Sequence, residues 1–129
     1  MSRSLTGWID RARAAGWSGR AWWQARRQLR RCRLVDIAVR TPPPHPSGHG
    51  RGSVLATLAL LRASCLERAV VLQRWDAADG RRRDLLIGVT RAGGRTRGHA
   101  WLEGEDPRGA FTVIHRRPAP AGPAHRVAA

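Results

Sequence analysis

The sequence of 129 residues contains no lysine, no asparagine and no tyrosine, and it has only two cysteines. Two cysteines cannot build the disulfide framework that stabilises small secreted domains. Cys32, Cys65 and the five histidines show no CxxC or HxxxH spacing, which argues against a zinc site. We therefore expect a reducing environment, no bound metal and no other cofactor.

Long apolar runs are also missing. The most apolar stretch, residues 54–61, ends at Arg62 and is far below the ~20 residues that span a bilayer. No apolar signal segment opens the chain. Together with the free thiols, these absences predict a cytoplasmic protein that has no membrane partner.

Acidic residues are scarce. There are nine of them against 24 basic residues, all arginine, which gives a formal net charge of +15. A charge of this size attracts polyanions and acidic peptide segments and raises association rates at low salt. We expect any binding of nucleic acid to be non-specific. An arginine-rich chain without lysine or asparagine is typical of a GC-rich bacterial genome.

The chain is long enough for one domain with a modest core. Composition divides it into a basic, Trp-rich helical segment (1–40), a proline-rich linker (41–52), a compact core (53–117) and a disordered tail (118–129). The first segment is expected to form one or two amphipathic helices, interrupted at Gly16 and Gly19. Four histidines in the linker, the last strand or the tail are expected to be surface residues: His45, His49, His115 and His125.

The most informative pattern lies around Cys65. Ser64 and Glu67 have the S-x-x-E spacing of a capping box, which makes Cys65 the first residue of a helix. At that position a thiol lies beside unpaired backbone N–H groups and the positive end of the helix dipole, and both favour the thiolate. The sequence thus predicts a reactive cysteine, against the alternative of a buried structural thiol.

The residues after Cys65 change from a helical to a strand pattern. The segment 66–75 has helical periodicity, and the segments 84–90, 98–103 and 110–115 suit strands separated by turns. These elements predict an α+β fold in which the cysteine helix packs on an antiparallel meander. In the second strand, His99, Trp101 and Glu103 point to one face. Trp101 is expected to be a core residue or a pocket wall.

The segments SCLERAVVLQRW, LLIGVTR, GHAWLEG and FTVIHRRP resemble the transglutaminase-like, papain-like peptidases of lasso-peptide biosynthesis. The resemblance covers about Val54 to Pro118. It implies a cysteine peptidase that removes the leader from a ribosomally made precursor peptide. It also implies a Cys-His-Asp triad, in which Cys65 and His99 match. The implied partners are a small leader-recognition protein and a lasso cyclase.

The third member of the triad is less obvious, because no acid follows Asp106 and no asparagine can replace it. Glu103 shares a strand face with His99 but stands roughly 13 Å along the strand, too far for its side chain. We therefore expect Asp106, in the following turn, to orient the imidazole. Thr112, a water molecule, or no third group at all are the alternatives.

In the expected reaction, the Cys65 thiolate attacks the scissile carbonyl and His99 returns the proton to the leaving amine. The backbone N–H of Cys65 is the expected first donor to the oxyanion. Attack by water on the thioester gives hydrolysis, whereas attack by an amine gives acyl transfer. The alternative function is a non-catalytic basic scaffold, or a nucleic-acid-binding module, with a degenerate peptidase fold.

Overall fold

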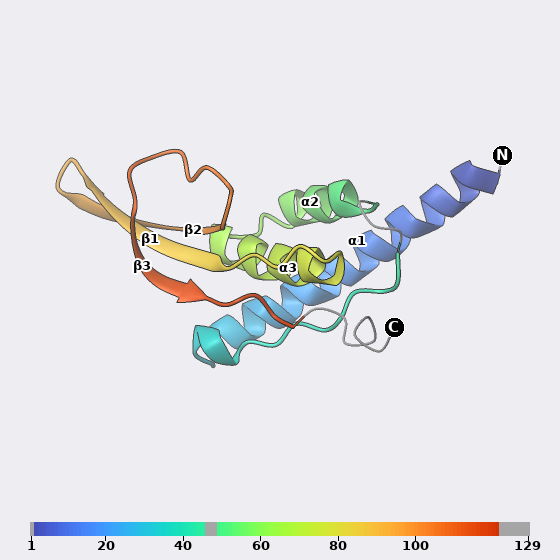
Figure 1. The fold of residues 1–129 in the computed structure, drawn as a ribbon, viewed down its shortest axis with the longest axis horizontal. Coiled ribbons are helices and arrows are strands. Elements are labelled where there is room, and N and C mark those ends of the chain that lie inside the picture. Colours follow the sequence, from blue (N-terminus) through green and yellow to red (C-terminus); the bar gives the residue numbers. More distant parts are fainter. Residues whose placement is uncertain (1, 46–48, 122–129) are drawn as a thin grey trace.

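The N-terminal half is helical in the computed structural model, which describes residues 2–45 and 49–121, with side chains from Gly7 onward. The long helix α1 (Ser2–Leu29) is followed by a single 3-10 turn (Leu34–Asp36), α2 (Arg51–Leu60) and α3 (Cys65–Ala78). Three strands follow: β1 (Leu85–Ala92), β2 (Arg95–Leu102) and β3 (Thr112–Arg117). The chain has the predicted α+β fold (Figure 1).

Helix α1 is continuous, so the expected interruption at Gly16 and Gly19 is wrong. Glycine disfavours a helix by about 1 kcal/mol relative to alanine. Here α1 packs against both α2 and α3, and tertiary packing overrides that preference. The buried face of the helix consists of Ala14, Trp17, Ser18, Ala21 and Ala25.

Helix α3 forms the centre of the core, since most of its residues are buried. Trp75 is fully buried and its ring lies 5.3 Å from that of Trp17 on α1. The Asp76 carboxylate is also fully buried, and it accepts hydrogen bonds from Arg51 and Arg83. A buried carboxylate with two guanidinium partners is satisfied rather than reactive. The start of α2 and the loop between α3 and β1 are therefore joined to α3 by ion pairs as well as by apolar contact.

His45, expected at the surface, is instead packed on α3. Its side chain is only 7% exposed, and its ring stacks on Trp75 at 4.0 Å. The Nε2 atom lies 2.6 Å from Oδ1 of Asp79. The composition of the linker did not indicate this contact, because Trp75 and Asp79 lie far along the chain. His49 and His115 are exposed as expected, whereas His125 and residues 122–129 of the expected tail lie outside the described residues.

The sheet is antiparallel, but its order is β2-β1-β3, so the expected meander is wrong. A meander needs a short turn between β2 and β3. The loop from Glu103 to Phe111 instead crosses the sheet and brings β3 to the free edge of β1 (Figure 1). Positive φ angles at Gly104, Arg108 and Gly109 allow its path.

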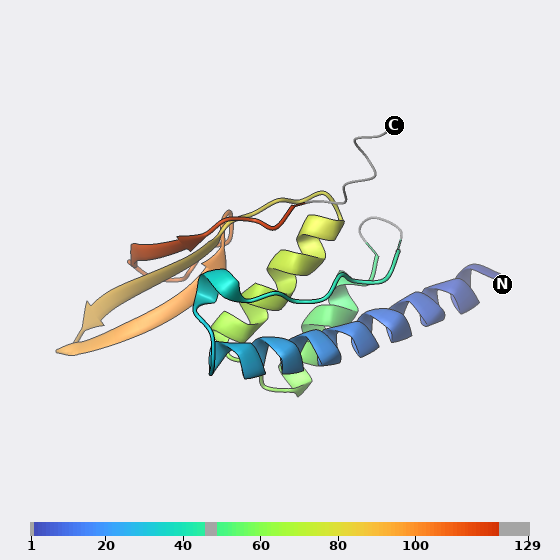
Figure 2. The ribbon, with the colours of Figure 1, turned by 90° about the horizontal axis from the view of Figure 1, so that it is seen from below.

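The two faces of the sheet have different environments. Leu85, Ala100 and Leu102 belong to the hydrophobic core that the helices share. His99 and Trp101 alternate with these residues along β2 and therefore point to the other face. The β1–β2 hairpin extends beyond the helices (Figure 2). No helix among the described residues is long and apolar enough to cross a membrane.

Candidate active site

The capping box predicted at the start of α3 is present. Oγ of Ser64 accepts a hydrogen bond of 3.1 Å from the backbone N–H of Glu67, and Oε1 of Glu67 accepts one of 3.0 Å from the N–H of Ser64. The helix begins at Cys65. Both cysteines, Cys65 and Cys32, are exposed, so a reagent or substrate can reach either thiol.

The capping carboxylate has a third partner that the sequence did not reveal. The indole Nε1 of Trp22, on α1, donates a hydrogen bond of 3.0 Å to the same Oε1 of Glu67. The guanidinium of Arg26 lies 5.3 Å from the ring centre of Trp22. Helix α1 thus contacts the start of α3, although Trp22 and Glu67 are separated by 45 positions in the chain.

His99 lies on β2 within a small aromatic cluster. Its ring stacks on Trp101 at 5.8 Å, with 16° between the planes, and lies 5.4 Å from Phe111. Gly88 faces His99 across the β1–β2 ladder. A Cβ atom at Gly88 would lie 2.7 Å from Cη2 of Trp101 and 3.0 Å from Cβ of Phe111, so only glycine leaves room for the cluster.

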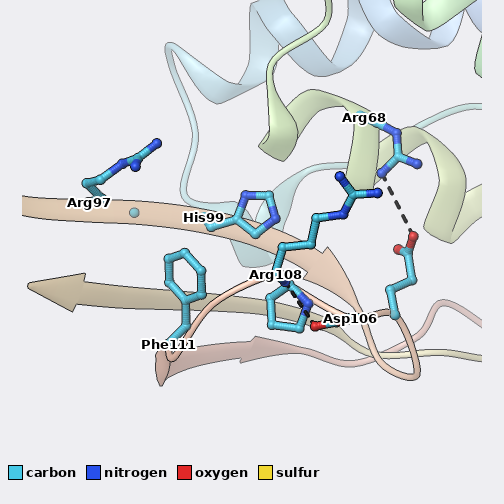
Figure 3. Close-up of a pocket in the computed structure, with 9 residues that line it drawn as sticks. Arg68, Arg97, His99, Asp106, Arg108 and Phe111 are labelled. Carbon is cyan, nitrogen blue, oxygen red and sulfur yellow. Dashed lines mark hydrogen bonds and ion pairs between the residues drawn. The ribbon is translucent and has the colours of Figure 1, made fainter. Parts of the chain in front are cut away.

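A pocket of about 660 Å³ opens beside His99. Figure 3 shows side chains from α3, β2 and the β2–β3 loop converging on it. The lining residues are Arg68, Arg97, Gly98, His99, Glu105, Asp106, Pro107, Arg108 and Phe111. Trp101 is 7% exposed and is not one of them. It supports the imidazole from within the protein.

The structure brings His99 and Asp106 to this pocket, whereas Cys65, at the start of the adjoining helix α3, is not among its lining residues. Arg68 lies three positions after Cys65, on the same face of α3, and it lines the pocket. Helix α3 also packs on β2. Within residues 2–45 and 49–121, however, no hydrogen bond joins the Cys65 thiol to the imidazole of His99. Catalytic hydrogen bonds are often long in proteins without substrate and shorten when substrate binds.

The two candidate acids have different partners. Oδ1 of Asp106 accepts a hydrogen bond of 2.9 Å from the backbone N–H of Arg108. Oε2 of Glu103 accepts one of 2.9 Å from Arg116, which also donates to Asp84. The hydrogen bond from Arg116, with a second from the backbone N–H of Ala119, holds the pKa of Asp84 below its ordinary value. Glu103 is thus directed toward Arg116 and β3.

Sequence reasoning missed the pocket residues Arg68, Arg97, Arg108 and Phe111, and also Gly88 below the cluster. No local motif marks them, since they meet only through the sheet register and the long β2–β3 loop. Thr112 lies at the exposed start of β3 and does not line the pocket. Among the described residues, no three His, Cys, Asp or Glu side chains are grouped so that they could hold a metal ion.

Comparison with known families gives one match. The model of the transglutaminase-like superfamily matches residues 4–116. No curated protein and no solved structure gives a significant match. The matched region begins within α1, so it includes the helix that contacts the capping box as well as the strands that carry the pocket.

Proposed function

Because the chain belongs to the transglutaminase-like superfamily, we propose that it is a cysteine peptidase that removes the leader from a lasso-peptide precursor. The superfamily includes cysteine proteases and transglutaminases. The observation that carries the proposal is an exposed cysteine at the first position of a capped helix that packs on β2, the strand that carries His99. The resemblance of the Cys65 and His99 segments to lasso leader peptidases supports the choice of substrate.

In the proposed reaction, the Cys65 thiolate attacks the scissile carbonyl carbon and forms a C–S bond. His99 holds the thiol proton and passes it to the leaving amine as the C–N bond breaks. Water then attacks the thioester and releases the acid and the thiol. The backbone N–H of Cys65, at the helix start, is the proposed donor to the tetrahedral oxyanion.

We assign the orienting role to Asp106, which lines the same pocket as His99. One of its carboxylate oxygens accepts from the N–H of Arg108, and the other accepts no hydrogen bond within the described residues. A carboxylate there fixes the tautomer of the histidine and stabilises the imidazolium. Glu103 is less suited, because Arg116 holds its carboxylate.

The proposed partners are a small leader-recognition protein and a lasso cyclase, and α1 offers a surface for docking. Trp8 and Trp23 are 66% and 54% exposed on this helix, among many arginines. Tryptophan and arginine are the residues most enriched at the centres of protein interfaces. A domain of this size has little surface with which to bind a long leader peptide specifically. We therefore propose that a partner protein recognises the leader.

The test compares single substitutions in the cleavage of the precursor, with the leader-recognition protein present. Cys65→Ala should abolish cleavage, whereas Cys32→Ala, which removes the other exposed thiol, should retain it. Asp106→Asn should lower turnover by about 10²-fold or more, since an amide can hold the wrong tautomer. Glu103→Gln is its matched control.

Full cleavage by Cys65→Ala would exclude the proposed nucleophile. Unchanged turnover in both Asp106→Asn and Glu103→Gln would reduce the site to a Cys65-His99 dyad. Selective alkylation of Cys65 over Cys32 near neutral pH provides an independent readout, because it needs no substrate. Two equally slow thiols, with tight and salt-sensitive binding of nucleic acid, would favour the scaffold alternative instead.

A further inference from the structure

Three arginines from three elements surround the pocket beside His99. Arg68 comes from α3, Arg97 from β2 and Arg108 from the β2–β3 loop. Figure 3 shows the Arg108 side chain extending from the loop into the space between His99 and Arg68. Its backbone has a φ of 53°, a left-handed conformation that is uncommon for a residue other than glycine. The hydrogen bond from its N–H to Asp106 stabilises that conformation.

The acids of the pocket do not neutralise all of these guanidinium groups. Glu105 lies 3.9 Å from Arg68 and also accepts from the backbone N–H of Leu102. Asp106 accepts from backbone only. In the part of the chain that the structure describes, the guanidinium groups of Arg97 and Arg108 have no carboxylate within ion-pair distance. The pocket therefore presents two unneutralised cations next to the proposed base.

We propose that this pocket binds a carboxylate of the peptide substrate, provided by an aspartate or glutamate side chain close to the scissile bond. The inference rests on the proposed function, because it takes the ligand to be the peptide that the site cleaves. Guanidinium groups bind carboxylates through charge-assisted and often bidentate hydrogen bonds. Arg97 and Arg108 are the residues that select the acidic side chain.

The shape of the pocket favours an acidic side chain over a small free anion. Phe111 and the ring of His99 are among the lining residues and offer an apolar surface to the methylene groups of the ligand. The arginines supply polar groups around them. A volume of about 660 Å³ accommodates a side chain together with its peptide backbone. A free C-terminal carboxylate has the same charge, so the test must separate the two sources.

The test uses the full chain with Cys65→Ala, so that binding is measured without cleavage, and three N-acetylated tripeptides as probes. Acetyl-Gly-Glu-Gly-amide carries a side-chain carboxylate, and acetyl-Gly-Gln-Gly-amide carries none. Acetyl-Gly-Gln-Gly with a free C-terminus carries a terminal carboxylate only. The readout is the chemical shift of the His99 ring protons on titration, at about 0.15 M salt to screen the general positive charge.

We expect the glutamate peptide to shift the His99 signals and to bind about tenfold more tightly than either glutamine peptide, as a charge-assisted hydrogen-bond pair predicts. Arg97→Gln and Arg108→Gln should each remove most of this preference. Arg95→Gln is the matched control. It removes the same charge from the same strand, two positions away, but it does not line the pocket.

Equal binding of the glutamate and glutamine peptides would overturn the proposal, and so would an equal loss in Arg95→Gln, which would indicate general charge attraction. Preference for the free C-terminus would reassign the source of the carboxylate and contradict the acidic side chain. These results do not depend on peptidase activity. The proposed function is tested by a different experiment. It would be contradicted if the chain with Cys65 intact did not cleave its precursor.

Discussion

At the scale of single residues, the capping carboxylate of Glu67 is the most connected group of the candidate site. Its Oε1 atom accepts from the N–H of Ser64 and from the indole of Trp22. The first contact is local and the second spans the domain. The position of the Cys65 backbone therefore depends on both α3 and α1.

Removal of either side chain that hydrogen-bonds Glu67, the Ser64 hydroxyl that accepts from its backbone N–H or the Trp22 indole that donates to its carboxylate, should loosen the start of α3. Ser64→Ala should lower the free energy of unfolding by about 1 kcal/mol through the lost cap. Trp22→Phe, which keeps an aromatic ring but deletes the N–H donor, should cost a similar amount, about 1 kcal/mol. Both variants should alkylate more slowly at Cys65 near neutral pH, because the polarising helix start is less ordered.

Chemical denaturation and the rate of reaction with iodoacetamide measure these two effects. Trp23→Phe is the control for Trp22→Phe, since Trp23 is the exposed neighbour in the same helix and makes no bond to Glu67. An unchanged alkylation rate in Ser64→Ala would mean that the cap does not govern the thiol.

Local sequence was sufficient for the start of the cysteine helix, because a capping box is defined by two residues three positions apart. It was insufficient for Trp22 and for His45, whose partners lie 45 and 34 positions away. Composition suggested a surface histidine in a linker, whereas the structure buries it against Trp75. The spacing of neighbouring residues does not predict a contact with a side chain that is distant in the sequence.

At the scale of elements, the sheet depends on one glycine. Gly88 on β1 lies under Trp101 of β2 and under Phe111, which precedes β3. The existence of three strands followed from their residue types, but their order did not. The loop between β2 and β3 is long enough to reach either edge of the sheet, and the choice of edge is made by tertiary packing.

Gly88→Ala should displace Trp101 and tilt the imidazole that stacks on it. Overpacking of this kind typically costs about 1–3 kcal/mol. The loss of stability should appear in thermal unfolding, and the ring-proton shifts of His99 should change. Gly98→Ala is the stability control, because a Cβ atom there would meet only a backbone oxygen at 3.9 Å. Equal stability of the two variants would contradict the close packing at Gly88.

At the scale of the whole molecule, α1 has two roles on two faces. One face contributes to the core, as Ala14, Trp17, Ala21 and Ala25 are buried. The other exposes Trp8 and Trp23. Deletion of residues 1–40 would therefore remove part of the core, and it is not a clean test of partner docking. The family match from residue 4 agrees with a helix that is integral to the domain.

The docking role is better tested by surface substitutions. The double variant Trp8→Ser and Trp23→Ser should weaken binding of the leader-recognition protein by about tenfold or more, as expected for exposed tryptophans at an interface centre. Leu60→Ser is the control, since Leu60 is 85% exposed but lies on α2. Calorimetric titration measures the affinities. Binding that is lost equally in the control would point to a different surface.

The hydrogen bond between Trp22 and Glu67 also has a consequence for how the chain matures. Its donor belongs to α1 and its acceptor to α3, so this hydrogen bond forms only after the two helices have docked. An unfolded or partly folded chain has the same thiol without the oriented helix start. Local opening of α1 from α3, short of global unfolding, should therefore silence the nucleophile. We therefore expect the reactivity of Cys65 to report whether α1 has docked on α3.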